Sequence, residues 1–333
     1  MNRADFIGAA CAAAASAGIP APRAGAPAVL KAPRLRPGDA VGLVAPSGPM
    51  ESARDLQHGL DQIALLGLRP VIGKHAMDKL AYLAGSDAAR ADDINTFARD
   101  PTIRGIFALR GGYGAMRILD LIDYAAFAAD PKVVFGFSDV TALLNAVTAR
   151  TGLVTFHGPV AAYSTYTPAV VREILAAVMS ATPIGTLHNE TAATVVPGIA
   201  HGRLVGGNLT LVSALAATPY AIPYAGNILF LEDVHEEPYR IDQMLTTLML
   251  AGLLQSAAGI AVGAISEPNV KPEHEPSPEL AQTLRDRLTL ARRPAARGLQ
   301  FGHILDQWIV PIGLAATLDA TACTLSIGEA AVT

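Results

Sequence analysis

Short apolar runs alternate with amphipathic stretches over the first half of the chain, from residue 40 to about residue 160. The apolar runs have the length of strands and predict buried strands over 40–45, 70–72, 105–109, 133–137 and 153–156. The stretches between them carry apolar residues at helical spacing and predict helices over 53–66, 87–98, 116–122 and 140–149. Strands that alternate with helices need crossover connections, which give a parallel sheet covered on both faces. The pattern therefore predicts a doubly wound α/β domain over 36–160.

The second half of the chain has a less regular pattern. Residues 161–200 contain one helical stretch, 169–179, and several Pro/Gly breaks, so we expect a connection between domains there. Beyond it the sequence predicts helices over 209–217 and 241–253, strands over 228–231, 260–265 and 325–327, and shorter strands around 309 and 314. These elements do not alternate regularly. We therefore expect a second, smaller domain over 201–327 with a mixed, barrel-like sheet.

Composition and charge exclude several classes of protein. The 333 residues are 51% hydrophobic, which is enough for a sizeable core. The 25 basic and 29 acidic residues are well mixed, without the basic patch that a nucleic-acid partner requires. The longest uncharged stretch, 243–266, is interrupted by polar residues and glycines, so no membrane span is expected. The partner expected from these features is a small molecule or a peptide.

Residues 1–30 differ from the rest of the chain. A basic start at Arg3 precedes an alanine-rich apolar segment from Phe6 to Gly18, followed by Pro, Ala and Gly residues. This order is typical of a signal peptide and predicts export to the periplasm. The alternative is a disordered alanine-rich tail on a cytoplasmic protein. Of the two cysteines, Cys11 lies in this leader and Cys323 in an apolar stretch, so no disulfide within a processed chain and no zinc site are expected.

A serine follows the apolar strand 133–137, where a helix is predicted to begin. Ser138 comes two residues after Gly136, and this arrangement is typical of a nucleophile elbow, in which a tight turn lifts the hydroxyl out of the sheet. Val140 stands where the usual motif has a second glycine. Serine is also a preferred N-cap, so a plain helix cap remains an alternative for Ser138.

A nucleophilic serine needs a base, and the base needs an acid that orients it. His157 and His303 each end an apolar segment beside a glycine, and the sequence alone does not separate them as bases. Glu232 and Asp233 stand at the tip of the strand over 228–231, where carboxylates are costly to bury without a partner. Either carboxylate could instead cap the following segment.

The loop Arg110–Gly114 is rich in glycine and also follows an apolar strand. Arg117 occupies the place of the third glycine in a dinucleotide-binding fingerprint, so that motif fails. Glycines at this place let backbone N–H groups approach a substrate, although an ordinary tight turn would look the same. The chain contains no H-E-x-x-H motif and no P-loop, so we expect neither a metal nor another cofactor.

Seven segments taken together resemble the LD-carboxypeptidase family of serine peptidases, the muramoyl-tetrapeptide carboxypeptidases. They occur in the order of the family: Gly38–Ser47, Leu109–Gly114, Gly136–Leu143, His157–Pro159, Gly202–Leu209, Leu231–Asp242 and Gly302-His303. The resemblance runs from about residue 35 to residue 327. It implies a flavodoxin-like N-terminal domain joined to a smaller C-terminal mixed α/β domain, with the active site between them.

The resemblance also implies roles for individual residues. Ser138 would be the nucleophile, Glu232 the acid and His303 the base. Backbone amides of Gly112 and Asp139 would form an oxyanion hole. Three further side chains near these segments are candidates for substrate contacts: Arg110, Tyr113 and Asn208.

The implied reaction is release of the terminal D-alanine from a murein tetrapeptide through an acyl-enzyme, and the implied assembly is a homodimer. Two other functions remain open at this point. One is the related branch of microcin C immunity hydrolases, which cleave an amide between an aminoacyl group and a nucleotide; Trp308, shortly after His303, could stack on the base. The other is a non-catalytic exported peptide-binding protein, which fits the leader and the two domains.

Overall fold

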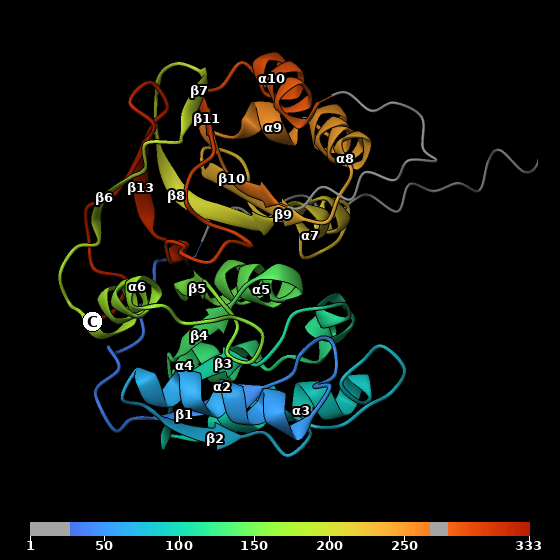
Figure 1. Cartoon of the computed structure of the whole chain (residues 1–333), viewed down its shortest axis with the longest axis vertical. Helices are drawn as coiled ribbons and strands as arrows, with labels where there is room; N and C mark the ends of the chain where they lie inside the picture. The colour runs from blue at the N-terminus through green and yellow to red at the C-terminus, as the bar shows by residue number, and fades with distance from the viewer. Residues whose placement is uncertain (1–26, 267–278) are drawn as a thin grey trace, which may run out of the picture.

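The structure is a computed structural model, and it describes residues 27–266 and 279–333. The predicted leader up to residue 26, with Cys11, lies outside the described residues. The described chain forms a six-stranded and an eight-stranded sheet, which Figure 1 shows one above the other with helices around them. No helix within these two ranges is both long and apolar enough to cross a bilayer.

The lower layer of Figure 1 is a doubly wound domain built on the six-stranded sheet. Its strands are β1 (Ala40–Val44), β2 (Arg69–Ile72), β3 (Ile103–Ala108), β4 (Val133–Gly136), β5 (Thr155–His157) and, from the far end of the chain, β12 (Val310–Ile312). The first five are parallel, in the order 2-1-3-4-5 of flavodoxin-like folds. This confirms the predicted N-terminal fold.

The helical elements of this domain are α2 (Ala53–Leu65), α3 (Asp87–Arg99), η1 (Ala115–Leu121), α4 (Tyr124–Ala129), η2 (Ser138–Val140) and α5 (Thr141–Thr151). Side-chain caps fix where two of them begin, because Ser52 and Ser86 accept hydrogen bonds from backbone N–H groups in the first turns of α2 and α3. The stretch predicted as a helix over 116–122 is the 3₁₀ helix η1, and α4 was not predicted.

The segment between the two halves contributes to the second sheet. It contains α6 (Pro168–Met179), as predicted, and then β6 (Gly185–His188) and β7 (Ala193–Val196). These two strands pair with β14 and β11 at opposite ends of the eight-stranded sheet. The prediction of a mere connection over 161–200 missed them, because both strands are short and partly exposed and so lack a long apolar run.

The upper layer of Figure 1 is built on the eight-stranded sheet, in the order β6-β14-β13-β8-β9-β10-β11-β7. Its other strands are β8 (Ile199–Asn208), β9 (Ile228–Val234), β10 (Gly259–Ser266), β11 (Ala295–Arg297), β13 (Ala315–Asp319) and β14 (Thr324–Ile327). Its helices are α7 (Leu209–Leu215), α8 (Pro238–Leu250), α9 (Leu253–Ser256) and α10 (Leu280–Ala291). Strands β8 to β11 are parallel and the others antiparallel, which confirms the predicted mixed sheet.

Side chains of β9 alternate between the two faces of this sheet. Ile228 and Phe230 belong to the hydrophobic core shared with the N-terminal domain, whereas Leu229 and Leu231 pack in a separate core with α7, α8 and α10. Successive residues of a strand point to opposite faces. The same alternation sends the side chain of Glu232 toward the N-terminal domain, and that of Asp233 toward α7.

Candidate active site

Ser138 lies at the sharp turn between β4 and α5. Its φ angle is +61°, a left-handed conformation that is uncommon for a residue other than glycine. A Cβ atom on Gly136 would lie 2.9 Å from Val140 Cγ1, so the turn can fold back this closely only with glycine there. Phe137, not Ser138, is the N-cap of η2, and neither η2 nor α5 has a side-chain capping hydrogen bond. The backbone is therefore that of a nucleophile elbow and not of a plain serine cap.

The glycine-rich loop after β3 packs against this turn. A Cβ atom on Gly111 would lie 2.9 Å from Ser138 Cβ and 3.0 Å from Ser138 Oγ. Gly48, in the loop after β1, donates its N–H to the Gly111 carbonyl at 3.1 Å. Because the C=O and the N–H of a trans peptide point in opposite directions, the N–H of Gly112 points away from Gly48. Its predicted role as an oxyanion donor stays a prediction.

Two buried charged side chains hold the three loops of this edge together. Asp139, beside Ser138, accepts a hydrogen bond from the N–H of Ala115 at 2.7 Å, and burial raises the pKa of its carboxyl group. Arg90 of α3 is fully buried and donates to the carbonyls of Pro46 and Gly114. Arg90 thus joins the loop after β1 to the loop after β3. The sequence gives no sign of this, because an arginine in an amphipathic helix normally faces solvent.

Glu232 and His303 form a close pair at the carboxyl edge of the eight-stranded sheet. His303 Nδ1 lies 2.6 Å from Glu232 Oε2, and the glutamate side chain is fully buried while 19% of the histidine side chain is exposed. Gly302 has φ +111°, and a Cβ atom there would lie 2.7 Å from Glu232 Cβ, so only glycine lets the two chain segments approach so closely. The His303 ring lies against that of Phe137, with centroids 4.4 Å apart, and so stands beside the Ser138 turn.

The environment keeps Glu232 ionised. Burial by itself raises its pKa, but the charge of His303 and the contacts with the imidazoles of His157 and His303 outweigh burial and lower the pKa to about 2. An ionised glutamate on Nδ1 leaves Nε2 of His303 as the nitrogen that can accept a proton from a nucleophile.

We expect this pair to make the folded protein less stable in acid. A glutamate in the unfolded chain binds a proton near its ordinary pKa of 4.5, whereas folded Glu232 stays ionised down to about pH 2. Between these values the unfolded state binds more protons, so the free energy of unfolding falls as the pH falls. Urea unfolding between about pH 5 and about pH 2.5 should show a steeper decline for the parent than for Glu232→Gln. Equal slopes for the two proteins would contradict this account of the pair.

Asp233 and Asn208 have their polar atoms engaged by one another and by α7. Asn208 donates from Nδ2 to Asp233 Oδ1 at 2.9 Å and accepts from the N–H of Leu211, which makes it the N-cap of α7. Asp233 also accepts from the N–H and the hydroxyl of Thr210. Burial and then the charge of Glu232 raise the pKa of Asp233 to about 6. Asn208 is buried, so its predicted substrate contact would need access that the structure does not give it.

The other two residues predicted to contact substrate, Arg110 and Tyr113, lie in the glycine-rich loop after β3. Arg110 donates to the carbonyl of Pro49 at 2.6 Å and to Glu51 at 3.1 Å, and its guanidinium group lies 4.6 Å from the centroid of the Tyr163 ring. Arg110 therefore braces the loop after β1. Tyr113, beside Gly112, is 72% exposed and so is accessible to a ligand.

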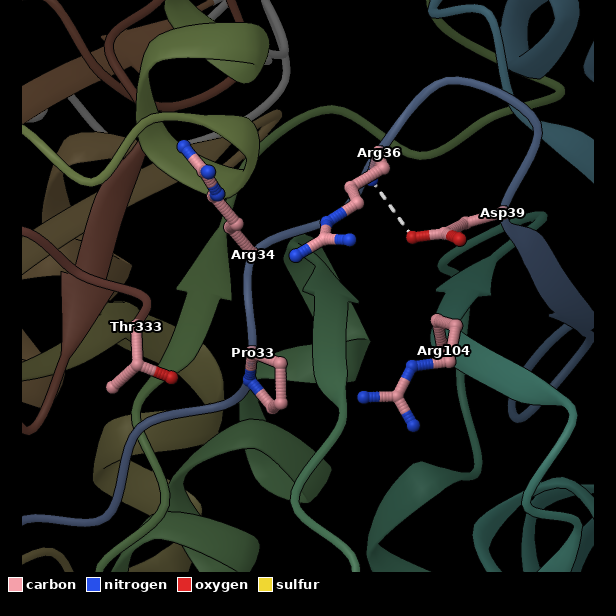
Figure 2. Close-up of a pocket in the computed structure, with 6 residues that line it drawn as sticks. All are labelled: Pro33, Arg34, Arg36, Asp39, Arg104 and Thr333. Carbon is pink, nitrogen blue, oxygen red and sulfur yellow. Dashed lines mark hydrogen bonds between the residues drawn. The ribbon is translucent and has the colours of Figure 1, made fainter.

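A cavity of about 300 Å³ lies at the opposite edge of the N-terminal sheet. Figure 2 shows the side chains that line it. It is lined by Pro33, Arg34, Arg36, Asp39, Arg104 and Thr333. Asp39 immediately precedes β1 and Arg104 is the second residue of β3, so the cavity lies at the amino ends of these strands. Ligands of open parallel sheets bind beyond the carboxyl ends, where Ser138 stands. This cavity is therefore separate from the candidate active site.

Among residues 27–266 and 279–333, no group of three or more His, Cys, Asp or Glu side chains lies where it could hold a metal ion.

Comparison with known proteins identifies the family. The family model of the LD-carboxypeptidase N-terminal domain matches residues 41–158, and that of the LD-carboxypeptidase C-terminal domain matches residues 201–318. The chain belongs to the LD-carboxypeptidase family. Two relatives in the family carry names that state a substrate. The "Probable murein peptide carboxypeptidase" of Bacillus subtilis is 37% identical over 303 residues, covering 88% of this chain and 92% of the relative. The "Murein tetrapeptide carboxypeptidase" of Pseudomonas aeruginosa is 30% identical over 296 residues, covering 84% and 92%.

A solved structure confirms the two-domain fold of this LD-carboxypeptidase family member. The microcin C7 self-immunity protein MccF, in complex with glutamyl sulfamoyl guanosine, superposes with a TM-score of 0.83. The match covers 91% of this chain and 100% of that one, at 23% identity. At this identity the likeness establishes the fold alone.

For this family member we expect Gly111→Ala to lower the rate of peptide hydrolysis on the order of 10²-fold or more, because the added Cβ displaces the Ser138 side chain. Gly328→Ala is the matched control, since a Cβ atom there meets nothing within 4 Å. Steady-state assays of both variants, with thermal unfolding as a check on folding, measure the difference. A Gly111→Ala protein with the parental rate would show that the loop does not confine Ser138.

Proposed function

We propose that the protein is a serine LD-carboxypeptidase that removes the terminal D-alanine from murein tetrapeptides. The observation that carries the proposal is the pairing of a strained serine turn with a buried Glu232–His303 pair. Phe137, the residue before Ser138, packs its ring against that of His303. The names of the two murein carboxypeptidases support the substrate.

In the first half of the reaction, Ser138 Oγ attacks the carbonyl carbon of the bond to D-alanine, and His303 Nε2 takes the hydroxyl proton. The carbonyl oxygen becomes an oxyanion, for which the backbone N–H groups of Gly112 and Asp139 are the proposed donors. The C–N bond then breaks as His303 returns the proton to the leaving amine. D-Alanine departs and an ester to Ser138 remains.

In the second half, a water molecule attacks the ester carbonyl while His303 takes one of its protons. The ester bond breaks, Ser138 recovers its proton from His303, and the tripeptide leaves with a new carboxylate. Glu232 keeps its negative charge throughout and orients His303 through Nδ1, as its lowered pKa requires.

The alternative function is hydrolysis of an aminoacyl nucleotide amide, which is compatible with the fold shared with MccF in complex with glutamyl sulfamoyl guanosine. The same serine chemistry would serve either substrate, so only the substrate separates the two functions. The non-catalytic peptide-binding alternative is disfavoured, because a binding protein has no use for a strained serine beside a buried Glu–His pair.

Parallel incubations test the proposal. The protein is given purified murein tetrapeptide or an aminoacyl sulfamoyl adenosine, with and without EDTA, and the products are identified by mass spectrometry. We expect tripeptide and D-alanine from the first substrate at a rate that EDTA does not change. Cleavage of the nucleotide amide with no conversion of tetrapeptide would instead establish the alternative. Tight tetrapeptide binding with turnover of neither substrate would refute both enzymatic functions.

A further inference from the structure

His157 is a buried titratable side chain beside the candidate active site that the mechanism above does not use. It is fully buried, and its backbone is fixed in the sheet by pairing with Gly136 of β4 and Val310 of β12. Its ring packs edge-on against two aromatic rings, that of Phe137 at 5.9 Å and 85° and that of Phe230 at 5.3 Å and 81°. Contacts on both sides hold the plane of the imidazole, and therefore the directions of its two nitrogens.

Two buried polar atoms without hydrogen-bond partners stand opposite each other here. His157 Nε2 lies 3.6 Å from Glu232 Oε1, and in the described part of the chain neither atom has a hydrogen-bond partner. The other oxygen of the carboxylate, Oε2, is occupied by His303. An unpaired oxygen on a buried carboxylate is costly, and His157 is the donor that stands in reach of it.

We propose that His157 is a positioning residue of the hydrolytic site, which donates its Nε2–H to Glu232 Oε1 and thereby keeps Oε2 directed at His303. The separation of 3.6 Å is longer than a hydrogen bond, and a side-chain movement of under ~1 Å brings the atoms to the usual N···O distance, as happens when active sites tighten on substrate. His157 Nδ1 has no partner, so the tautomer with its hydrogen on Nε2 satisfies the pair best.

The contact also joins the two domains. His157 ends β5 in the domain that carries Ser138, whereas Glu232 lies near the carboxyl end of β9 in the domain that carries His303. A Cβ atom on Gly207 of β8 would lie 3.3 Å from His157 Cδ2, so glycine there gives the ring its room between the sheets. His157 therefore sets the position of the acid and base from one domain relative to the serine of the other. This role rests on the proposed function, since it assigns the same serine, acid and base.

Three substitutions test whether His157 orients Glu232 through its N–H or only fills space in the core. His157→Phe keeps a ring in the aromatic pocket and removes the N–H. His157→Gln keeps an amide N–H close to the position of Nε2, and His157→Asn carries the same amide one carbon short. The readouts are kcat and KM on tetrapeptide, the rate at which a fluorophosphonate labels Ser138, and the downfield proton resonance of the His303–Glu232 hydrogen bond.

We expect His157→Phe and His157→Asn to lower kcat and the labelling rate on the order of 10- to 100-fold, with KM little changed, and to shift the downfield resonance. His157→Gln should recover most of the rate and the parental resonance. Parental labelling rates in the Phe and Asn variants would overturn the proposal. So would a Gln variant as slow as the Asn variant when circular dichroism shows both to be folded.

The role of His157 can still be tested if one variant does not fold or if tetrapeptide is not the substrate. If His157→Phe does not fold, the Gln and Asn variants still differ only in the reach of the amide. Labelling of Ser138 does not depend on the natural substrate, so a parent that is labelled but leaves tetrapeptide intact refutes the proposed substrate, while the labelling series still tests His157.

Discussion

Ser138→Ala is expected to lose hydrolysis of murein tetrapeptide by on the order of 10⁶-fold in kcat. The reason is that Ser138 is the proposed nucleophile, and an alanine there leaves only the binding site and the oxyanion donors to assist water. Timed release of D-alanine, followed at enzyme concentrations high enough to detect the residual rate, measures the loss.

Ser213→Ala is the control for this experiment. Ser213 lies on α7, which follows β8 of the eight-stranded sheet, and its hydroxyl makes no hydrogen bond among the described residues. The control should keep the parental rate. A Ser138→Ala protein that still converts tetrapeptide within about 10-fold of the parental rate would exclude Ser138 as the nucleophile.

His303→Ala is expected to cost nearly as much as Ser138→Ala, on the order of 10⁴- to 10⁶-fold in kcat, because a serine hydroxyl without its base is a weak nucleophile. The double variant Ser138→Ala/His303→Ala should be no slower than the slower single variant, since the two residues act as a unit. The control is His201→Ala, which should keep the parental rate. His201 lies on β8 and forms a hydrogen bond with the hydroxyl of Thr317 on β13. Losses that multiply in the double variant would mean that the two side chains act independently.

Much of the parallel half of the fold is predictable from the sequence because several of its strands are buried along their length. β1 and β4 are covered on both faces and read as unbroken apolar runs, which the pattern of the chain shows directly. β6 and β7 are short and partly exposed at the edges of their sheet, so they carry no comparable signal. The return of β12 to the N-terminal sheet depends on pairing with β5 about 155 residues earlier, which no local pattern encodes.

In the candidate site too, some features are predictable from the sequence and others are not. The serine turn follows from an apolar strand, a glycine and a serine in sequence, and the left-handed backbone of Ser138 then distinguishes an elbow from a cap. The residue pattern does not distinguish the neighbouring carboxylates Glu232 and Asp233, and only the family resemblance favours Glu232 as the acid. The alternation of β9 separates them, because one side chain reaches His303 and the other reaches α7. The burial of Arg90 was missed. Its ion pair with Asp87 lies within one helix, but the backbone carbonyls of Pro46 and Gly114 that it also contacts come next to it only in the folded chain.

The most direct test of the central claim is to treat the protein with a fluorophosphonate, digest it and locate the phosphonylated residue by mass spectrometry. The account predicts stoichiometric modification of Ser138 that removes all hydrolytic activity, is slowed by murein tetrapeptide and is absent from His303→Ala. Modification of a different residue, or full activity in a protein whose Ser138 is modified, would contradict it.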